Sequence, residues 1–435
     1  MEALLSLCKR RGFVFQSSEV YGGLNSCWDY GPLGIELMRN IKEAWWLEMT
    51  RFNRDIEGID ASILMAPRVW EASGHVSNFS DPMVDCKKCK KRFRADTIEN
   101  VKTCSEKKCG GELTEVREFN LMFQTQMGPV SGEGANVYLR PETAQGIFVN
   151  FLNVQTSMRR KLPFGIAQIG KSFRNEITPG NFIFRTREFE QMEMQFFIKP
   201  GTQAEWFEKW KEKRMAWHKR YIRQSDQLDF KPHGPDEIAF YADKAVDIVY
   251  PFPFSDKKEE IEGIHSRTDY DLAQHQEFSG KNLSYYDDES KERYIPYVVE
   301  TAIGAGRFML MVLADAYEEE TLEKDSRVVM KFHPCLAPVK VAVLPLVKKH
   351  GMPEKALGIV DEWSPHFKVA YDPSAAIGRR YRRQDEIGTP YCVTVDGTTL
   401  EDGTVTLRHR DSMLQDRMTV DEAFHFISEN VRYKP

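Results

Sequence analysis

The chain lacks several features that would place it in a special class of proteins. No apolar run is long enough to cross a bilayer, and the N-terminus, MEALLSLCKRRGF, has too short an apolar run before its basic residues for a secretory signal. No internal repeat or low-complexity segment is present, which argues against a solenoid. Charge of one sign is also lacking, because 60 Lys and Arg face 65 Asp and Glu. Composition therefore gives no argument for a polyanionic partner, and we expect a cytoplasmic protein without a membrane segment.

Basic residues do gather locally near the C-terminus. Arg379, Arg380, Arg382 and Arg383 crowd one short segment, but Asp385 and Glu386 follow directly. On charge alone, this pattern predicts a solvated face rather than a binding surface.

Cysteine is sparse, yet half of it is concentrated in one place. Four of the eight cysteines form the pairs Cys86-x2-Cys89 and Cys104-x4-Cys109. Tight pairs separated by a short hairpin's worth of chain can supply four thiolates to a structural zinc ion. The alternative is a set of reduced surface thiols left from a decayed site. The other cysteines, Cys8, Cys27, Cys335 and Cys392, are scattered, and we expect them to be buried or inert.

The most informative segment runs from Phe173 to Glu193 and reads FRNE, a turn-rich loop and REFEQME. Alternation from Ile166 predicts a strand that runs into Arg174 and Glu176. Pro179, Gly180 and Asn181 indicate a turn. Alternation resumes from Phe184 to Phe197 and predicts a returning strand. One face of that strand would carry Arg185, Arg187, Phe189, Gln191, Glu193 and Gln195.

Such a hairpin could hold a nucleotide, with arginines for the phosphates and an aromatic ring for the base. The alternative is the solvated face of an antiparallel sheet. A rival motif overlaps it, since Gly165–Ser172 reads GIAQIGKS and satisfies the P-loop pattern. A P-loop follows a strand and opens a helix, whereas this segment itself is predicted to be strand and is followed by FRNE and a turn. We interpret the P-loop match as coincidence.

FRNE followed by REFEQME resembles motif 2 of the class II aminoacyl-tRNA synthetases, in the form found in glycyl-tRNA synthetases. Further segments resemble that family in the right order across nearly the whole chain: WDYGPLG (28–34), EASGH (71–75), FRAD (93–96), RPETAQGIF (140–148), YIPYVVETAIGAGR (294–307), HPCLAPVKVAVLPL (333–346) and IGRRYRRQDEIGTPYCVTVD (377–396). The resemblance implies activation of glycine with ATP to glycyl-adenylate, transfer to the 3′ end of tRNA(Gly), and release of AMP and pyrophosphate.

The resemblance also implies an α/β (α+β) chain of several domains, consistent with a length of 435 residues. An antiparallel-sheet catalytic domain would occupy residues 1–85 and 119–333, interrupted by a cysteine-rich zinc insertion at 86–118 and carrying a helical insertion at 200–245. Within the latter, Thr202–Gln227 is an amphipathic pattern whose aromatics are best explained by core packing; in the family, insertions here lie near the tRNA acceptor end. Strands alternate with helices after Ala337, which predicts a separate α/β domain at residues 337–435. This segment resembles the anticodon-binding domain shared by several class II synthetases, and the resemblance implies that role.

The family's motif 1 forms a dimer interface and needs a long helix, a strand and a proline. Ile35–Asn53, Gly58–Met65 and Pro67 would serve, which predicts a homodimer.

Catalytic roles carried over by resemblance fall to Arg174, Glu176 and Arg307. Arg174 would contact the α-phosphate and the substrate carboxylate, Glu176 would accept from the adenine amino group, and Arg307 would cover the adenine and reach the γ-phosphate. The implied ATP contacts are Arg174, Asn175, Glu176, Phe184, Arg185, Phe189, Glu260, Ile261, Gly304 and Arg307. Glu260 would hold Mg²⁺, although Glu259 and Glu262 are so close that a register slip would change the choice.

Glycine offers only an ammonium and a carboxylate, so carboxylates must read its ammonium and bulk must exclude alanine. The substrate contacts implied by resemblance are Arg94, Glu142, Phe189, Gln191, Glu193, Glu300 and Gly304. Each of the three glutamates could instead be a structural ion-pair partner. One departure stands out, because the family commonly has Glu-Pro-Ser where this chain has Glu300-Thr301-Ala302, so a serine hydroxyl near the substrate is missing.

Three alternatives belong to other functional classes. A synthetase-like regulator or biosynthetic enzyme would adenylate a different acid, but such paralogues often lack the anticodon domain. A non-catalytic tRNA-binding protein would be expected to lose Arg174 or Arg307. A P-loop NTPase would hydrolyse ATP without an amino acid and lose activity on Lys171→Ala.

Overall fold

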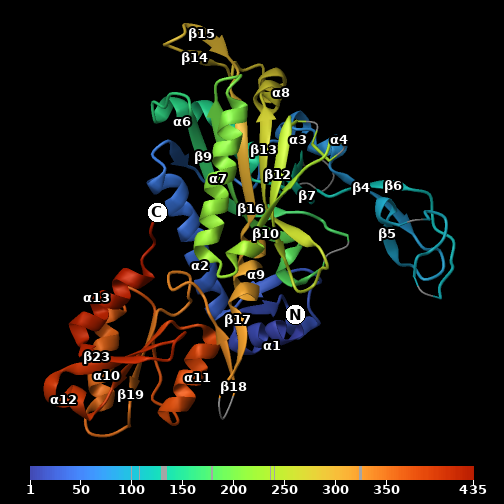
Figure 1. Cartoon of the computed structure of the whole chain (residues 1–435). Helices are drawn as coiled ribbons and strands as arrows, with labels where there is room; N and C mark the ends of the chain where they lie inside the picture. The colour runs from blue at the N-terminus through green and yellow to red at the C-terminus, as the bar shows by residue number, and fades with distance from the viewer. Residues whose placement is uncertain are drawn as a thin grey trace.

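The computed structural model describes residues 1–98, 100–106, 108–128, 135–177, 180–235, 237–239, 241–322 and 326–435. Pro179, predicted to lie in a turn, is outside these residues. Figure 1 shows a large central sheet flanked by helices, a cysteine-containing segment that projects to one side, and a smaller α/β unit at the C-terminal end. In the part of the chain described, no helix is long and apolar enough to cross a membrane.

The central sheet has seven strands in the order β11-β12-β13-β16-β10-β9-β3, and only the β3–β9 pair is parallel. Its strands are β3 (Ile56–Gly58), β9 (Phe164–Phe173), β10 (Glu188–Ile198), β11 (Asp229–Pro232), β12 (Lys244–Pro251), β13 (Lys258–Thr268) and β16 (Tyr297–Gly304). β9 and β10 form the predicted hairpin, in register from Phe173 opposite Glu188 to Phe164 opposite Phe197.

Side-chain alternation gives the two faces of this sheet different characters. On β10, Met192, Met194 and Phe196 are buried in the main hydrophobic core. Helices α2 (Pro32–Leu47), α7 (Gln203–Tyr221) and α9 (Ala305–Ala316) contribute to the same core. The aromatics of α7 do pack there: Phe207, Trp210 and Trp217 are buried, each contributing roughly 1.5–3 kcal/mol by burial. The opposite face is divided: Phe164, Ile166, Phe197 and Val298 pack there in a second hydrophobic cluster with helices α5 (Ala144–Val149) and α6 (Phe151–Ser157), and the rest of that face carries polar residues.

Smaller elements connect and flank the sheet. The helices are α1 (Glu2–Arg11), α3 (Pro67–Ala72), α4 (His75–Asn78), α5 (Ala144–Val149), α6 (Phe151–Ser157) and α8 (Tyr270–Ser279). Single turns of 3-10 or π-helix lie at η1 (Glu19–Tyr21), η2 (Glu48–Phe52), η3 (Ala95–Thr97), η4 (Phe182–Phe184) and η5 (Ser225–Gln227). Two-stranded pairs join β1 (Val14–Gln16) to β2 (Trp28–Tyr30), β7 (Gln124–Met127) to β8 (Ala135–Tyr138), β14 (Tyr285–Asp287) to β15 (Glu292–Tyr294), and β17 (Tyr317–Thr321) to β18 (Ser326–Met330).

The projecting segment holds a three-stranded sheet of β4 (Ser80–Asp85), β5 (Arg92–Arg94) and β6 (Arg117–Asn120), in the order β5-β4-β6. Its own small core contains Val84, Leu113 and two cysteines, Cys86 and Cys104. With so little apolar surface to bury, this segment needs a further source of stability.

The C-terminal unit confirms the predicted alternation of strands and helices. Its five-stranded sheet has the order β20-β19-β21-β22-β23, parallel at β20-β19-β21 and antiparallel beyond. The elements are β19 (Val341–Pro345), α10 (Met352–Trp363), β20 (Val369–Tyr371), α11 (Ile377–Ile387), β21 (Tyr391–Val395), α12 (Gly397–Asp402), β22 (Thr404–His409), β23 (Gln415–Thr419) and α13 (Val420–Val431). A separate core around Trp363 and Val393 holds it together.

Three predictions of local structure were wrong. The returning strand begins at Glu188 rather than Phe184, because Ile183 and Phe184 are buried in η4; Arg185 and Arg187 therefore precede the strand. The strand expected at Gly58–Met65 is the short β3, which ends at Gly58. The arginine-rich segment is not simply a solvated face, because Arg380 is buried and donates to the Pro345 carbonyl at 2.6 Å.

The P-loop interpretation is excluded by position. Gly165–Ser172 lies wholly within β9, between β10 and β3, and opens no helix. Lys171 is exposed and pairs with Glu188 across the hairpin.

Candidate active site

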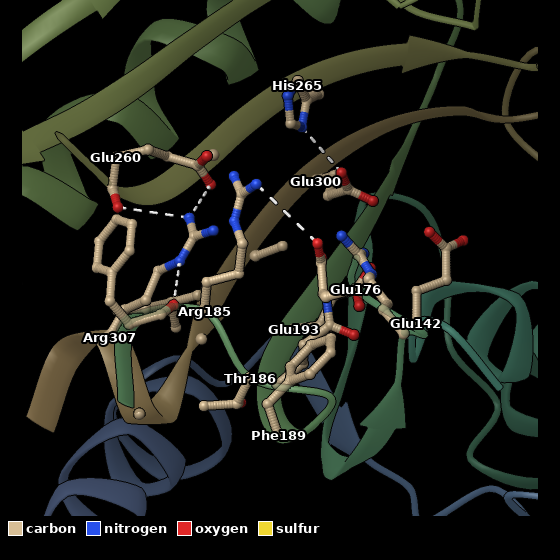
Figure 2. Close-up of a pocket in the computed structure, with 18 of the residues that line it drawn as sticks. Glu142, Glu176, Arg185, Thr186, Phe189, Glu193, Glu260, His265, Glu300 and Arg307 are labelled. Atoms are coloured by element: carbon tan, nitrogen blue, oxygen red, sulfur yellow. Dashed lines mark hydrogen bonds and ion pairs between the residues drawn. The ribbon is translucent and has the colours of Figure 1, made fainter. Parts of the chain in front are cut away.

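A cavity of about 200 Å³ lies on the polar face of the central sheet. Its walls come from β10, β13 and β16, from the loop that follows β9, from η4 and from the start of α9 (Figure 2). The lining residues include Glu142, Arg174, Glu176, Phe184, Arg185, Phe189, Gln191, Glu193, Glu260, Glu300, Gly304 and Arg307. The structure thus brings together every predicted ATP and substrate residue except Asn175, Ile261 and Arg94.

Arg174 is held firmly at one side of the cavity. It lies directly after β9, and its Nε donates to the Pro141 carbonyl at 3.0 Å. Its guanidinium lies between two rings, 5.4 Å from the centroid of Phe79 and 5.4 Å from that of Phe189. Cation–π contacts and a backbone anchor fix its direction and leave other N–H groups to bind an anion.

Arg307 lies at the opposite side, where β16 ends and α9 begins. Its Nη1 is 3.0 Å from Glu260 Oε1, its Nε donates to the Phe184 carbonyl at 3.3 Å, and its guanidinium covers the Phe184 ring at 4.6 Å. Figure 2 shows these contacts beside Arg185, which lies 4.0 Å from Glu176. The positive charge of Arg307 lowers the pKa of Glu260, so this carboxylate is ionised at neutral pH.

A β-bulge decides which acidic residue of β13 reaches the cavity. Val249 of β12 pairs with Glu260 and Ile248 pairs with Glu262, which leaves Ile261 as the extra residue. Since a bulge changes the phase of a strand, Glu260 joins Gly263 and His265 on the cavity side. Glu262 instead lies buried on the core side, where Arg214 of α7 donates to it at 2.6 Å. The choice of Glu260 over its neighbours therefore agrees with the geometry, and Ile261 is a core residue.

Three carboxyl groups gather at the deep end of the cavity. Glu300 accepts from Arg267 at 2.8 Å and lies 2.9 Å from His265 Nδ1. Glu142 lies 3.3 Å from His75 Nε2 and accepts from Gln145 at 3.0 Å. Glu193 accepts from Gln195 at 2.7 Å and from the hydroxyl of Thr143. Glu193 and Glu300 are buried and Glu142 is half-buried, so each charge depends on its neighbours.

The three glutamates differ in ionisation. Burial opposes the charge on Glu142, but His75, Arg267 and the hydrogen bond from Gln145 together outweigh it and lower the pKa to about 2. Burial likewise opposes the charge on Glu300, but Arg267 and His265 lower its pKa. Burial raises the pKa of Glu193 well above its ordinary value, and the charges of Glu300 and Glu142 raise it further. The cluster therefore holds two carboxylates and one carboxyl group that is readily kept protonated.

Three predicted site residues lie elsewhere. The backbone N–H of Asn175 donates to the Leu121 carbonyl, and its side chain does not line the cavity. Ile261 is buried in the bulge. Arg94 lies on β5, where Asp81 and Asp96 bind its guanidinium at 3.1 and 2.8 Å. Those carboxylates hold Arg94 on the projecting segment in this structure.

The structure also shows where Thr301 and Ala302 lie, the two residues that replace the family's Pro-Ser after Glu300. Ala302 lines the cavity, while Thr301 is fully buried and pairs with Met194 and Ile264, whose side chains belong to the main core. Because neighbouring residues of a strand face opposite ways, the Thr301 hydroxyl does not replace the missing serine.

Sequence reasoning missed Tyr241, His265 and Arg267, which line the cavity among the glutamates. The Arg267 guanidinium lies 3.9 Å from the centroid of Tyr241 and is bound by Asp271 at 2.8 Å. One signal was available: in the second half of this strand, His265 and Arg267 alternate with Ile264 and Ser266.

The four clustered cysteines come together as their spacing predicted. Their sulfur atoms all lie within 4.8 Å of one another, with 3.7 Å between Cys86 and Cys109 and 3.7 Å between Cys89 and Cys104. A tetrahedral zinc ion with Zn–S bonds of about 2.3 Å requires sulfur atoms roughly 3.8 Å apart. The donor set and its geometry are thus compatible with zinc.

Two comparisons with known proteins decide the family. Residues 124–316 match the family model "tRNA synthetase class II core domain (G, H, P, S and T)", and residues 340–430 match "Anticodon binding domain". A glycine–tRNA ligase of Treponema denticola is 57% identical over an alignment of 440 positions. The alignment covers 99% of this chain and 97% of that protein.

The chain belongs to the glycine–tRNA ligase family of class II tRNA synthetases. Other glycine–tRNA ligases match this chain over nearly their full length. That of Chlorobaculum tepidum is 53% identical, covering 98% of this chain and 99% of the relative, and that of Borreliella burgdorferi is 55% identical, covering 100% and 98%. The resemblance seen in motif 2 is therefore confirmed, and the cavity lies within the matched class II core.

Proposed function

We propose that this chain activates glycine with ATP to glycyl-adenylate and transfers the glycyl group to the 3′ end of tRNA(Gly), releasing AMP and pyrophosphate. The observation that carries this proposal is the convergence of Arg174 and Arg307 with Glu142, Glu193 and Glu300 in one cavity. Cations for a polyphosphate and carboxyl groups for an ammonium are what a glycine and an ATP require together. A non-catalytic tRNA-binding role is disfavoured because both arginines remain in the cavity.

Adenylate formation needs positioning and charge stabilisation rather than a protein nucleophile, because the substrate carboxylate itself attacks the α-phosphorus. We assign Arg174 to the α-phosphate and the glycine carboxylate, and Arg307 with Arg185 to the outer phosphates. Glu176 would accept from the adenine amino group, and Phe189 would stack on the ring. Phe184 and Gly304 would complete the nucleotide contacts, with Gly304 open to close approach because a Cβ there meets no atom closer than 3.6 Å.

The glycine ammonium would be read by Glu142, Glu193 and Glu300, with Gln191 completing the wall. The first and last carry the negative charge, while Glu193 contributes hydrogen bonds in its protonated form. Asn175, Ile261 and Arg94 could reach a substrate only through the backbone or after movement of the projecting segment, so we give them no role in the first step.

Magnesium is proposed to bind at Glu260 together with ATP phosphates, since hard cations prefer carboxylate and phosphate oxygens. The Glu260 side chain is ionised and 47% exposed, so it is accessible to a hydrated cation. We expect Glu260→Gln to raise the Mg²⁺ concentration needed for half-maximal activity, while Glu259→Gln, which removes a neighbouring carboxylate that accepts from Ser255, leaves it unchanged. Equal effects of both substitutions would argue against this site.

The domain division proposed from sequence is retained: residues 1–85 and 119–333 catalytic, 86–118 a zinc-stabilised insertion, 200–245 an insertion within the catalytic domain, and 337–435 an anticodon-binding domain. The 200–245 segment contains the strand β11 as well as the helix α7. Separate cores in the projecting segment and in the C-terminal unit support it. As an enzyme of translation, the protein is proposed to act in the cytoplasm.

A homodimer is proposed as well. Val20 and Tyr21 are 90% and 91% exposed, and Leu24 is 55% exposed on the same loop, which is unusual for large apolar side chains of a monomer. Sedimentation at micromolar concentration should give twice the mass of the chain; a monomeric mass would contradict the proposal.

The function itself is tested by charging. Purified protein, ATP, Mg²⁺ and radiolabelled glycine should place label on tRNA(Gly) transcripts and not on a tRNA of different identity. Absence of label on tRNA(Gly), from protein with a cooperative melting transition, would overturn the assignment.

A further inference from the structure

The two halves of the chain are joined by a buried charged network outside the candidate active site. It consists of Arg327 on β18, Asp385 on α11 and Arg408 on β22, defined here as the interdomain network. All three side chains are at most 5% exposed. Arg327 precedes the C-terminal unit, and the other two belong to it. Figure 1 shows β18 beside α11.

Asp385 is the centre of the network. Arg408 donates to its two oxygens at 2.8 and 3.0 Å, and Arg327 Nη1 donates to Oδ2 at 3.0 Å. Asp385 lies in the last turn of α11, where the helix dipole disfavours negative charge. Arg382 of the same helix lies 3.9 Å from this carboxylate but is 36% exposed. The buried charge is therefore compensated chiefly by the two buried guanidinium groups, one from each side of the boundary between the units.

Hydrogen bonds donated by Arg327 and by Arg410 cross the boundary between the two units in opposite directions. Arg327 also donates to the backbone carbonyls of Arg410 at 2.9 Å and Asp411 at 3.4 Å. Arg410, from the C-terminal unit, donates in return to the Phe332 carbonyl at 2.8 Å. Bonds to backbone on both sides fix orientation more strictly than a pair of mobile side chains would.

The network lies outside the cavity, although the two are close along the chain. The β17–β18 hairpin that carries Arg327 follows α9 directly, and α9 begins beside Arg307. Close packing supports the junction, because a Cβ on Gly388 would lie 2.3 Å from the Phe332 ring. No residue of the network lines the cavity. The adenylation chemistry therefore does not need it, whereas a tRNA that touches both units does.

We propose that Arg327 is a positioning residue for tRNA: through Asp385 it sets the C-terminal unit at the orientation in which one tRNA reaches the C-terminal unit and the cavity together. The inference rests on the proposed function. If the orientation is lost, tRNA binds each unit separately. The gain in affinity that comes from binding both units at once then disappears. Adenylation, which uses only small substrates, continues.

The test compares Arg327→Lys and Arg327→Met with Arg223→Lys as a matched control. Arg223 donates to Glu318 on the same hairpin at 2.8 Å, and its other hydrogen bonds go to Asp315, which also lies outside the C-terminal unit. Its charge acts on Asp411 of that unit, and Arg223→Lys retains this charge. Arg327→Lys keeps the positive charge but loses the planar guanidinium that donates to several acceptors at once. If Arg327→Met does not fold, Arg327→Lys still tests the proposal.

Glycine-dependent exchange of pyrophosphate into ATP and charging of tRNA(Gly) are measured for each variant. For Arg327→Lys we expect exchange within about twofold of wild type and a fall of at least about tenfold in kcat/KM for tRNA, mainly through KM. The control should match wild type in both assays. Unchanged tRNA charging, or exchange and charging that fall in parallel, would overturn the positioning role. Wild-type protein that charges no tRNA would instead contradict the proposed function.

Discussion

The carboxyl groups of Glu193 and Glu300 share one side-chain amide: Gln195 Nε2 lies 2.7 Å from Glu193 Oε1 and 2.5 Å from Glu300 Oε2. Their pKa values nevertheless move in opposite directions, up for Glu193 and down for Glu300. Arg267 donates a hydrogen bond directly to Glu300, whereas its charge acts on Glu193 only at longer range and is outweighed there by burial and by the other two glutamates. One charge rather than two is therefore the stable state of this pair.

The pair predicts unequal effects of two matched substitutions. Glu300→Gln removes one of the two carboxylates that pair with buried Arg267 and the negative charge proposed to bind the glycine ammonium. It should raise KM for glycine in pyrophosphate exchange by about tenfold or more, since a hydrogen bond to a charged group contributes roughly 1.5–3 kcal/mol. Glu193→Gln resembles the protonated acid and should change KM by less than about tenfold. Melting curves would show whether each variant is folded. A larger effect of Glu193→Gln would show that Glu193 acts as a carboxylate.

Stability should depend on pH through Glu193. Its pKa is raised in the folded state, so the native protein holds a proton that the unfolded chain releases above about pH 4.5. Stability is then lost as pH rises toward the folded-state pKa, by at most about 1.4 kcal/mol per pH unit. The melting temperature of Glu193→Gln minus that of wild type should increase between pH 5 and 7. A difference that stays constant would mean that Glu193 is already ionised at pH 5.

The cysteine cluster predicts a metal-dependent segment. Cys86→Ser and Cys104→Ser should each release about one zinc per chain, because either substitution breaks the tetrahedron. Cys392→Ser, which alters a buried cysteine of the C-terminal unit, should leave the zinc content unchanged. Protease cleavage within residues 86–118 should become faster in the first two variants. Unchanged metal content after loss of Cys86 would refute the site.

Much of the site could be predicted because motif 2 combines the alternation typical of two strands with the specific residues FRNE and REFEQME. Alternation in β9 and β10 assigned Phe189, Gln191 and Glu193 to one face, as the structure has them. The start of β10 was misplaced because the burial of Ile183 and Phe184 in η4 depends on partners distant in sequence, among them Phe252 and Phe254.

Other features depend on tertiary contacts that alternation does not encode. The bulge at Ile261 reverses the phase of β13, so Glu260 and Glu262 face opposite sides although they are two residues apart. His265 and Arg267 were overlooked because their meaning depends on Glu300, which lies on the neighbouring strand β16. Arg94 was assigned by motif alone, and the carboxylates that bind it were not considered.

The most direct test of the account is pyrophosphate exchange into ATP with glycine, alanine and serine supplied separately, because exchange isolates adenylation and needs no tRNA. We predict exchange with glycine and about fivefold to a hundredfold less exchange with alanine, because its extra methyl must enter a rigid site at a cost of about 1–3 kcal/mol. We predict no exchange with glycine after Arg174→Ala. Exchange driven equally well by alanine or serine, or unaffected by loss of Arg174, would contradict the assignment of this cavity as a glycine-activating site.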